Sequence, residues 1–579
     1  MNPNDPMAAM PAWMTQLADP ARWQHFLQPA QAAQAAQAAQ AAPDPMAQFK
    51  TMQAEIDPAV MAKLQADYVQ QLAVLWETAL ASKPAVLADK RFAAPAWQTN
   101  TTMGFNAATY LLNAKFLTAM VDAVKATPKM REKIRFSVQQ MIDAMSPANF
   151  LVTNPEAQQK LIESKGESLT KGLAHMLADL KKGRISQTDE SAFEVGRNVA
   201  TTEGAVVFEN ELFQLLQYKP LTKTVYARPL LIMPPCINKF YILDLQPENS
   251  LVRYAVAEGH TVFLISWRNP DNTLSKKTWD DYVEHAAFKA IEVVQEISGA
   301  EQINALGFCV GGTILSTALA LLYARGENPI ASLTLLTDFL DFSDTGVIDV
   351  FIDEQQVALR EQAIGQGGLM QGKDFASTFS SLRSNDLVWS YVKSNYLKGE
   401  EPPPFDLLYW NADSTNMPGP MFCWYLRNLY LEDRLKVPGK LTVLGEPVDL
   451  GKIAAPSFVY ASREDHIVPW QAAFTNMSLL NPKNRKLNQF VLGASGHIAG
   501  VINAPSKNKR SFWSNDKAAA SADAWLAGAT ETPGSWWPQW SAFLTKHAGK
   551  QVKPPRQYGN ARYQPIEAAP GRYVRAKSD

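Results

Sequence analysis

The pentapeptide GFCVG, residues 307–311, has the glycine-x-nucleophile-x-glycine spacing of a nucleophile elbow. In such an elbow, a sharp turn between a strand and a helix presents one side chain at its tip, here Cys309. Because a cysteine thiolate attacks carbonyl carbon, the motif predicts acyl transfer through a covalent thioester. A cysteine packed between glycines for structural reasons is the alternative. The apolar run INALGF before the motif and the helical run after it favour the elbow.

A cysteine nucleophile needs a base, and the histidines that follow Cys309 in the chain are His466, His497 and His547. Catalytic triads of α/β-hydrolases run in the order nucleophile, acid, histidine. His497 lies in GASGHIAG, directly after a predicted strand, where a glycine-rich loop can bring an imidazole over the elbow. We therefore assign His497 as the general base and expect a supporting or structural role for His466.

The acid of the triad is expected after the preceding strand, PSFVYAS, where the sequence continues SREDHIVPW. We assign Asp465 to this role. Glu464 is the less favoured substitute, because the side chains of adjacent residues point apart. Asp449 and Asp244 are expected to be structural.

An oxyanion that forms at the attacked carbonyl group needs two backbone N–H donors. The first is expected from Val310, directly after the nucleophile. The second is expected from the loop PPCIN, residues 234–238. Since proline has no N–H, Cys236 or Ile237 must supply it. The Cys236 side chain is interpreted as a small apolar filler beside the site, with direct substrate contact as the alternative, and Cys423 as a core residue.

The elements around these residues predict an α/β-hydrolase fold from residue 204 to residue 579. Short apolar runs alternate there with helical segments, which is typical of a mostly parallel sheet covered by helices. About 120 residues separate two predicted strands, far more than an α/β connection needs. We interpret residues 338–455 as an inserted cap over the active site. The six predicted strands are PLLIMPP (229–235), HTVFLISW (260–267), INALGF (303–308), ASLTLLT (331–337), PSFVYAS (456–462) and NQFVLGA (488–494).

Residues 50–203 predict a helical N-terminal domain, because apolar residues recur at three- and four-residue steps in segments such as 110–126 and 132–145. Residues 1–49 are expected to be a flexible segment, and they include the repeat QAAQAAQAAQAA, which has no apolar face to bury. The uncharged run at residues 302–324 is long enough to cross a bilayer. Its glycine cluster instead favours a strand, a tight turn and a buried helix.

The composition argues against several classes of protein. The 55 lysines and arginines against 56 aspartates and glutamates leave a net charge of −1, which argues against a nucleic-acid binder held by phosphate contacts. The three cysteines lie far apart without CxxC spacing, so neither a disulfide framework nor a zinc site is indicated. No basic residue followed by an apolar run begins the sequence, so we expect no secretory signal and a reducing, cytosolic setting.

The use of sulfur rather than oxygen as the nucleophile favours one kind of reaction. A cysteine acyl-enzyme is itself a thioester, so loading it from coenzyme A is nearly thermoneutral, and passing the acyl group to a hydroxyl is then favourable. The cysteine therefore favours acyl transfer from a thioester to an alcohol over plain hydrolysis, although some cysteine hydrolases share the elbow.

Longer motifs resemble those of the polyhydroxyalkanoate synthases. The length and the helical N-terminal region resemble the class that has one subunit type and prefers short-chain monomers. The resemblance runs from about residue 100 to the C-terminal GRYVRAK and leaves out the QAA repeat. The motifs are PPCINKFYILDLQPENSLVRY (234–254), FLISWRNPD (263–271), GFCVGG, DLLYWNADSTNMPGP (406–420), SREDHIVPW and GASGHIAGVINAP.

This resemblance implies polymerisation of (R)-3-hydroxyacyl-CoA, typically 3-hydroxybutyryl-CoA, into a polyester with release of coenzyme A. It implies that Cys309 is the covalent nucleophile, that His497 is its base and that Asp465 is the third catalytic residue. Asp465 would either orient His497 or help to activate the 3-hydroxyl group of the incoming unit. No metal or redox cofactor is implied.

The resemblance also implies a homodimer, a cap that rearranges on activation, and residence at the surface of a cytoplasmic polymer granule. The helical N-terminal domain would bind granules or granule-coating proteins, or it would be an ordinary packed bundle. Trp536, Trp537 and Trp540 are expected in the core rather than against polymer. The competing interpretations are a cysteine-dependent α/β-hydrolase, such as a thioesterase or polyester depolymerase, and a non-catalytic granule-coating protein.

Overall fold

The computed structural model describes residues 56–84 and 87–578, so the expected flexible segment 1–49 with its QAA repeat lies outside the described chain. Within the described ranges, no helix is both long and apolar enough to cross a membrane. The uncharged run at residues 302–324 forms a strand followed by a buried helix, as its glycine cluster predicts.

The chain forms two compact units, whose limits differ from the expected boundary between residues 203 and 204. Residues 190–203 belong to the second unit because they are bonded to it. The Ala200 N–H donates to the Asp244 carbonyl oxygen (2.8 Å), and the Thr202 hydroxyl donates to the Asp244 carboxylate (2.5 Å). The first unit ends at Asp189 and also contains Arg383–Pro403, and the second consists of Glu190–Leu382 and the chain from Pro404 onward.

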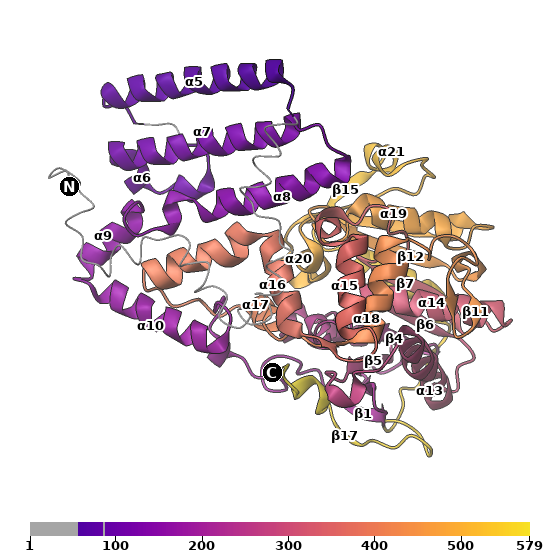
Figure 1. Cartoon of the computed structure of the whole chain (residues 1–579). Helices are drawn as coiled ribbons and strands as arrows, with labels where there is room; N and C mark the ends of the chain where they lie inside the picture. Colours follow the sequence, from indigo (N-terminus) through magenta and orange to yellow (C-terminus); the bar gives the residue numbers. More distant parts are fainter. Residues whose placement is uncertain (1–55, 85–86, 579) are drawn as a thin grey trace. The chain divides into compact units, whose positions relative to one another are not determined.

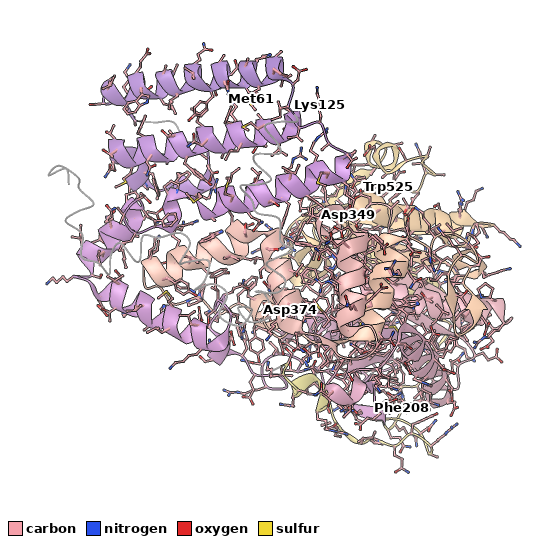
Figure 2. All side chains as sticks on the ribbon, viewed as in Figure 1. Met61, Lys125, Phe208, Asp349, Asp374 and Trp525 are labelled. Atoms are coloured by element: carbon pink, nitrogen blue, oxygen red, sulfur yellow. The ribbon has the colours of Figure 1, made fainter. Side chains whose placement is uncertain are left out.

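Helices build the first unit, and several begin at a residue whose side chain caps the first turn. They are α5 (Pro58–Leu80), α6 (Pro95–Thr99), α7 (Thr101–Ala123), α8 (Pro128–Ala144), α9 (Pro155–Glu163) and α10 (Glu167–Lys182). The capping residues are Asp57, Asn100, Thr127 and Asn154. Helices α5, α7 and α8 lie side by side (Figure 1), and Met61 of α5, labelled in Figure 2, packs against their shared core.

Part of the expected cap belongs to the first unit, where buried polar groups hold it. Asp143 of α8 accepts hydrogen bonds from the Ser384 hydroxyl (2.5 Å) and the Asn385 amide (2.6 Å). Asp179 of α10 accepts one from the Tyr396 hydroxyl (2.8 Å). The segment Arg383–Pro403, which interrupts the chain of the second unit, is thus a structural part of the helical unit.

A large sheet forms the centre of the second unit, in the order β15-β14-β13-β12-β7-β6-β4-β5-β2-β1-β17 among the described strands. The six strands from β13 to β5 are parallel and coincide with the six predicted ones, which confirms the α/β fold. The outer strands pair antiparallel and were not predicted. The strands are β1 (Gly204–Glu209), β2 (Phe213–Tyr218), β4 (Leu230–Met233), β5 (Val262–Trp267), β6 (Ile303–Phe308), β7 (Ile330–Leu336), β12 (Ser457–Ser462), β13 (Gln489–Gly493), β14 (Ser511–Ser514), β15 (Thr530–Pro533) and β17 (Glu567–Ala568).

Both faces of this sheet are buried. Alternate side chains of β4 enter different cores, Leu231 and Met233 on one side and Leu230 and Ile232 on the other, as expected for a sheet with helices on both faces. The surrounding helices are α11 (Leu251–Ala257), α12 (Trp279–Tyr282), α13 (Lys289–Ser298), α14 (Val310–Ala324), α19 (Trp470–Leu479), α20 (His497–Val501), α21 (Ala522–Ala527) and α22 (Trp537–His547). The helices of the expected cap that belong to this unit are α15 (Glu354–Ile364), α16 (Gly372–Leu382), α17 (Asp406–Asn411) and α18 (Gly419–Tyr425). Trp525 of α21, labelled in Figure 2, packs edge-on against Phe490 of β13.

A buried histidine in this unit predicts a loss of stability in acid. His260 is 1% exposed beside Tyr226, and neither of its ring nitrogens has a hydrogen-bond partner among the described residues. Burial lowers the pKa of His260 from 6.5 to about 4. Between pH 6.5 and pH 4, His260 is protonated in the unfolded chain but not in the native protein. The free energy of unfolding therefore decreases as the pH is lowered through this range, by about 3 kcal/mol in total.

His260→Phe keeps an aromatic ring but cannot be protonated. The decline in melting temperature between pH 6.5 and pH 4 is therefore expected to be smaller in the variant than in the natural protein. Thermal unfolding followed by circular dichroism measures this difference. The matched control is His285→Gln, which removes a half-exposed histidine. Identical declines in the natural protein and in His260→Phe would show that His260 is not held neutral by burial.

Candidate active site

The predicted elbow is present, and its backbone is strained. Cys309 is the N-cap residue of α14 and has φ 51° and ψ −137°, a conformation that residues with a side chain rarely adopt. A Cβ on Gly307 would lie 2.3 Å from the Gly312 Cα, and one on Gly311 would lie 2.4 Å from the Met233 carbonyl oxygen. The glycines are therefore required by close backbone contacts, and the half-buried thiol is presented at the tip of the turn.

The structure brings His497 and Asp465 together. His497 is the first residue of α20, after β13, and Asp465 follows β12; the His497 Nδ1 lies 2.7 Å from the Asp465 Oδ2. The other carboxylate oxygen accepts the backbone N–H groups of Ile467 (2.8 Å) and Val468 (2.9 Å). Because an ionised carboxylate only accepts hydrogen bonds, Nδ1 carries the proton in this pair and Nε2 is left for Cys309.

The charge of His497 follows from its surroundings. Burial opposes protonation, but the Asp465 carboxylate and the neighbouring Cys309 outweigh it and raise the pKa of His497 from 6.5 to about 10. The influence of Cys309 on this pKa shows that the imidazole lies near the sulfur. An imidazolium beside the sulfur stabilises the thiolate, the nucleophilic form of cysteine.

Two tryptophans hold the helix that carries His497. The indole N–H groups of Trp536 and Trp537 donate to the carbonyl oxygens of Gly500 (3.1 Å) and Val501 (2.9 Å), both in α20. These two tryptophans and Trp540 are fully buried, which confirms that they belong to the core. Trp536 and Trp537 therefore support the imidazole indirectly, through the backbone of α20, whereas the Trp540 indole donates to the Thr334 hydroxyl of β7 (3.1 Å).

The other two cysteines are poor nucleophiles. Burial raises the pKa of Cys236 to about 12 and that of Cys423 to about 11, so both thiols stay protonated at neutral pH. Cys236 interacts electrostatically with Cys309 and therefore lies near it, as a filler beside the site would. Cys423 lies in the core, as predicted.

The two expected sources of oxyanion donors adjoin each other. Val310 is the first residue of α14, so its N–H has no acceptor within the helix. The loop after β4 lies against the first turn of α14, since a Cβ on Gly311 would lie 2.5 Å from the Pro234 carbonyl oxygen. The Trp267 indole N–H donates to that carbonyl oxygen (2.9 Å) and fixes the loop. The assignment of Val310 with Cys236 or Ile237 as donors stays a prediction.

Two cap tyrosines beside Cys309 were not predicted. Burial raises the pKa of Tyr425 and Tyr430, and Cys309 contributes to both shifts. Their rings lie 5.2 Å apart, and Tyr425 also stacks on Trp279 (5.5 Å, 14°). The five-residue spacing in MFCWYLRNLY brings them together because residues 426–431 form a π-helical turn. The turn is a property of the folded backbone, so the two tyrosines could not be assigned to the site from the sequence.

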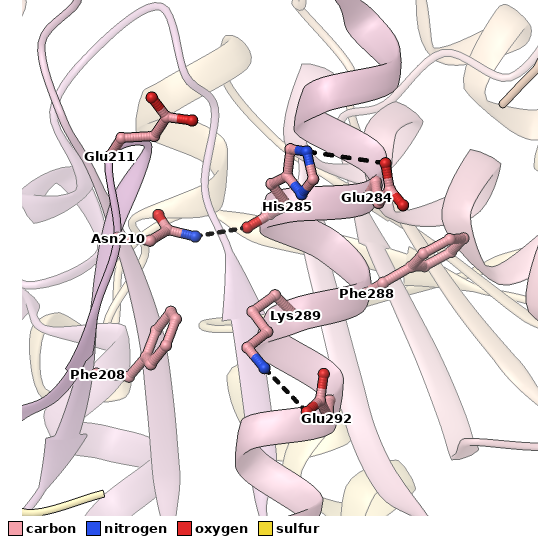
Figure 3. A pocket seen from close by; sticks show the side chains of 8 residues that line it. All are labelled: Phe208, Asn210, Glu211, Glu284, His285, Phe288, Lys289 and Glu292. Atoms are coloured by element: carbon pink, nitrogen blue, oxygen red, sulfur yellow. Dashed lines mark hydrogen bonds and ion pairs between the residues drawn. The ribbon is translucent and has the colours of Figure 1, made fainter.

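An open cavity elsewhere in the second unit is separate from these residues. It has a volume of about 530 Å³ and lies between the end of β1 and the helical segment that includes α13 (Figure 3). Its charged side chains pair locally, as Lys289 does with Glu292 (2.9 Å). None of Cys309, Asp465 and His497 lines this cavity, so we place the chemistry at the elbow.

Two family models match this chain and define the class of protein to which it belongs. Residues 229–504 match the family model described as alpha/beta hydrolase fold, in agreement with the sheet and the elbow. Residues 88–255 match the model described as poly-beta-hydroxybutyrate polymerase (PhaC) N-terminus. Together, the two models match both the helical region and the sheet.

Similar proteins then define the family. The chain is 62% identical to the poly(3-hydroxyalkanoate) polymerase subunit PhaC of Cupriavidus necator, over 90% of each chain. It is 41% identical to the protein of the same name from Rhizobium meliloti, over 85% of this chain and 80% of that one. It is 40% identical to the poly(3-hydroxyalkanoate) polymerase of Methylorubrum extorquens, over 92% of this chain and 90% of that one. The chain therefore belongs to the polyhydroxyalkanoate synthase family, and it is an enzyme, an acyltransferase.

Proposed function

We propose that this enzyme polymerises (R)-3-hydroxyacyl-CoA, with 3-hydroxybutyryl-CoA as the main substrate, through a thioester on Cys309. Membership of the family supports the overall reaction. The single structural observation that supports the mechanism is Cys309 at the tip of a strained turn, beside an imidazole that is hydrogen-bonded to Asp465. The proposed chemistry uses these side chains and needs no metal or redox cofactor.

The first half-reaction loads the enzyme. The Cys309 thiolate attacks the thioester carbonyl carbon, and the resulting oxyanion accepts hydrogen bonds from the Val310 N–H and from the loop that contains Cys236 and Ile237. The bond to the coenzyme A sulfur then breaks. The His497 imidazolium gives its proton to the departing thiolate, which leaves neutral His497 and an acyl group on Cys309.

The second half-reaction transfers the acyl group to a hydroxyl. Neutral His497 takes the proton from the 3-hydroxyl of the acceptor, whose oxygen attacks the acyl carbon on Cys309 and forms an ester. The carbon–sulfur bond breaks, and the thiolate and imidazolium are restored. Because a thioester is exchanged for an ester, this transfer is favourable.

Two products distinguish a polymerase from a cysteine hydrolase. Purified enzyme supplied with 3-hydroxybutyryl-CoA is expected to release coenzyme A and to form insoluble polyester. Coenzyme A is quantified with a thiol reagent, and the acyl products are separated by solubility. If free 3-hydroxybutyrate is the only acyl product, the polymerase proposal is wrong and a thioesterase or depolymerase fits better.

Asp465→Asn is expected to give a slow enzyme that still acylates Cys309. The amide keeps the size of the side chain but can turn its N–H₂ toward His497, which removes the charge that favours the imidazolium. We expect turnover to fall by about 10²-fold to 10⁴-fold. Rapid chemical quench measures both half-reactions.

The slow half-reaction identifies the role of Asp465. Slow acylation indicates that Asp465 orients His497, whereas fast acylation with slow transfer indicates activation of the acceptor hydroxyl. Asp449→Asn is a control, because that carboxylate caps the short helix Leu450–Lys452 and takes no part in the pair with His497, so both rates should be unchanged. Unchanged rates in Asp465→Asn would remove Asp465 from the mechanism.

We also propose that the enzyme works as a homodimer at the surface of cytoplasmic polyester granules. Membership of the family and the insolubility of the polymer support this location. Light scattering of the purified protein, with and without substrate, measures its oligomeric state. A monomer throughout turnover would contradict the dimer.

A further inference from the structure

A buried carboxyl group behind the nucleophile elbow has no part in the mechanism above. Asp338 follows β7 and is 1% exposed. Its Oδ1 accepts a hydrogen bond from the Thr313 hydroxyl (2.8 Å), which lies in the first turn of α14. Its Oδ2 has no hydrogen-bond partner within the described residues. A buried polar atom without a hydrogen-bond partner lowers the stability of the folded protein, so we looked for a function that this carboxyl group could have.

The carboxyl group of Asp338 contacts the elbow itself. A Cβ on Gly312 would lie 2.8 Å from both the Cγ and the Oδ2 of Asp338, so the carboxyl group fills the space that a side chain at residue 312 would need. The Gly312 N–H donates to the Cys309 carbonyl oxygen (2.7 Å) and is thus part of the turn that carries the nucleophile. Asp338 therefore supports the turn from behind, through Gly312 and Thr313.

The backbone of Asp338 is held as firmly as its side chain. The Asn476 amide of α19 donates to the Asp338 carbonyl oxygen (2.9 Å) and accepts the Leu340 N–H (3.1 Å). Asn476 is fully buried. The carboxyl group and the backbone carbonyl group of Asp338 are thus both held by hydrogen bonds. A shift of the elbow relative to β7 would break the hydrogen bond between Thr313 and Asp338.

The charge of Asp338 decides whether it helps or hinders the nucleophile. The titratable groups that face it are Tyr425 and Tyr430 of the cap, which also interact with Cys309; Thr313, Gly312 and Asn476 carry no charge. Burial raises the pKa of Asp338 well above its ordinary value, and the Thr313 hydroxyl and the backbone N–H groups of Phe339 and Thr313 oppose this only in part. An ionised carboxylate here would repel the Cys309 thiolate, whereas a carboxylic acid would not.

We propose that Asp338 is a positioning residue of the elbow that works as a neutral carboxylic acid, supporting the turn at Cys309 without a second negative charge behind the thiolate. This inference rests on the proposed function, because it takes Cys309 as the nucleophile. Its test therefore includes a readout that needs no acyl-CoA.

Asp338→Asn and Asp338→Ala in the full chain separate the charge of this residue from its shape. The two readouts are coenzyme A release from 3-hydroxybutyryl-CoA and the rate at which iodoacetamide alkylates Cys309 between about pH 6 and pH 10. The Cys309→Ala protein supplies the background from Cys236 and Cys423. Alkylation reports on the thiolate even if the proposed substrate is wrong.

Near pH 7, Asp338→Asn is expected to match the natural enzyme within about twofold in both readouts, because it is neutral and of the same shape. Asp338→Ala is expected to release coenzyme A at least about tenfold more slowly, since the support is lost. At alkaline pH, where only the natural carboxyl group can ionise, alkylation of Asp338→Asn is expected to exceed that of the natural enzyme.

Two results would overturn the proposal. If Asp338→Asn is as slow as Asp338→Ala, or if its alkylation profile is already displaced near pH 7, the carboxyl group acts in its charged form. If Asp338→Ala behaves like the natural enzyme in both readouts, Asp338 positions nothing. Should the natural enzyme form no polymer while the alkylation profiles differ as expected, the proposed function fails and the positioning role stands.

A second pair of variants covers the case in which Asp338→Ala does not fold. Thr313→Val removes the hydroxyl that binds Asp338 and is expected to slow coenzyme A release, whereas Thr313→Ser keeps the hydroxyl and is expected to restore it. Equal rates in Thr313→Val and Thr313→Ser would contradict support of the elbow through this hydrogen bond. Circular dichroism confirms the fold of each variant.

Discussion

Replacing Cys309 with alanine is expected to reduce coenzyme A release from 3-hydroxybutyryl-CoA by about 10⁴-fold or more. The change removes the sulfur to which the acyl group is proposed to bond, and nothing near the elbow replaces it: the Cys236 thiol is buried and stays protonated at neutral pH. Alanine fits the half-buried site without clash, so the fold is expected to remain. Coenzyme A release followed with a thiol reagent measures the loss.

The matched control for this variant is Cys423→Ala. It removes a cysteine of the same chain from a buried position in the cap, and it is expected to keep most of the activity. Undiminished release of coenzyme A by Cys309→Ala would show that Cys309 is incidental, as in a protein that coats granules without catalysing their synthesis.

Replacing His497 with alanine is expected to reduce turnover by about 10³-fold to 10⁴-fold. Both half-reactions are expected to be slower, because His497 acts in each of them. Its charged form stabilises the thiolate, and its neutral form deprotonates the acceptor hydroxyl. Burial lowers the pKa of His497, but Asp465 and Cys309 outweigh it and raise the pKa to about 10, so the charged form is favoured in this site. Steady-state coenzyme A release measures the loss.

His547→Gln is the control for this second variant. His547 lies at the end of α22, and burial, together with neighbouring Lys546 and Arg228, lowers its pKa, so its charged form is disfavoured. The control is expected to keep its activity. If His497→Ala were as active as His547→Gln, another group would have to be the base.

The centre of the fold and the residues of the candidate site could be read from the sequence because both depend on local patterns. The six parallel strands are buried on both faces, so each appears as a continuous apolar run. The elbow needs glycines at fixed offsets, and the chain order of α/β-hydrolases then selects Asp465 and His497. In the structure, the His497 Nδ1 lies 2.7 Å from the Asp465 Oδ2.

What was missed depends on contacts between distant parts of the chain. Strands β14 and β15 are short and partly polar, and only pairing with a neighbour makes them strands. The segment Arg383–Pro403 joins the helical unit through Asp143 and Asp179, which are more than 200 residues away in sequence. Asp338 reads as an ordinary residue after a strand, and only the packing of Gly312 against it reveals its place behind the nucleophile.

The most direct test of the mechanism is to trap the enzyme during turnover with radiolabelled 3-hydroxybutyryl-CoA, quench it in acid and map the labelled peptide. We expect the label on the peptide that contains Cys309, released by neutral hydroxylamine as a thioester is, and absent from Cys309→Ala. If coenzyme A is released at the normal rate while no label is found on Cys309, the covalent mechanism is wrong.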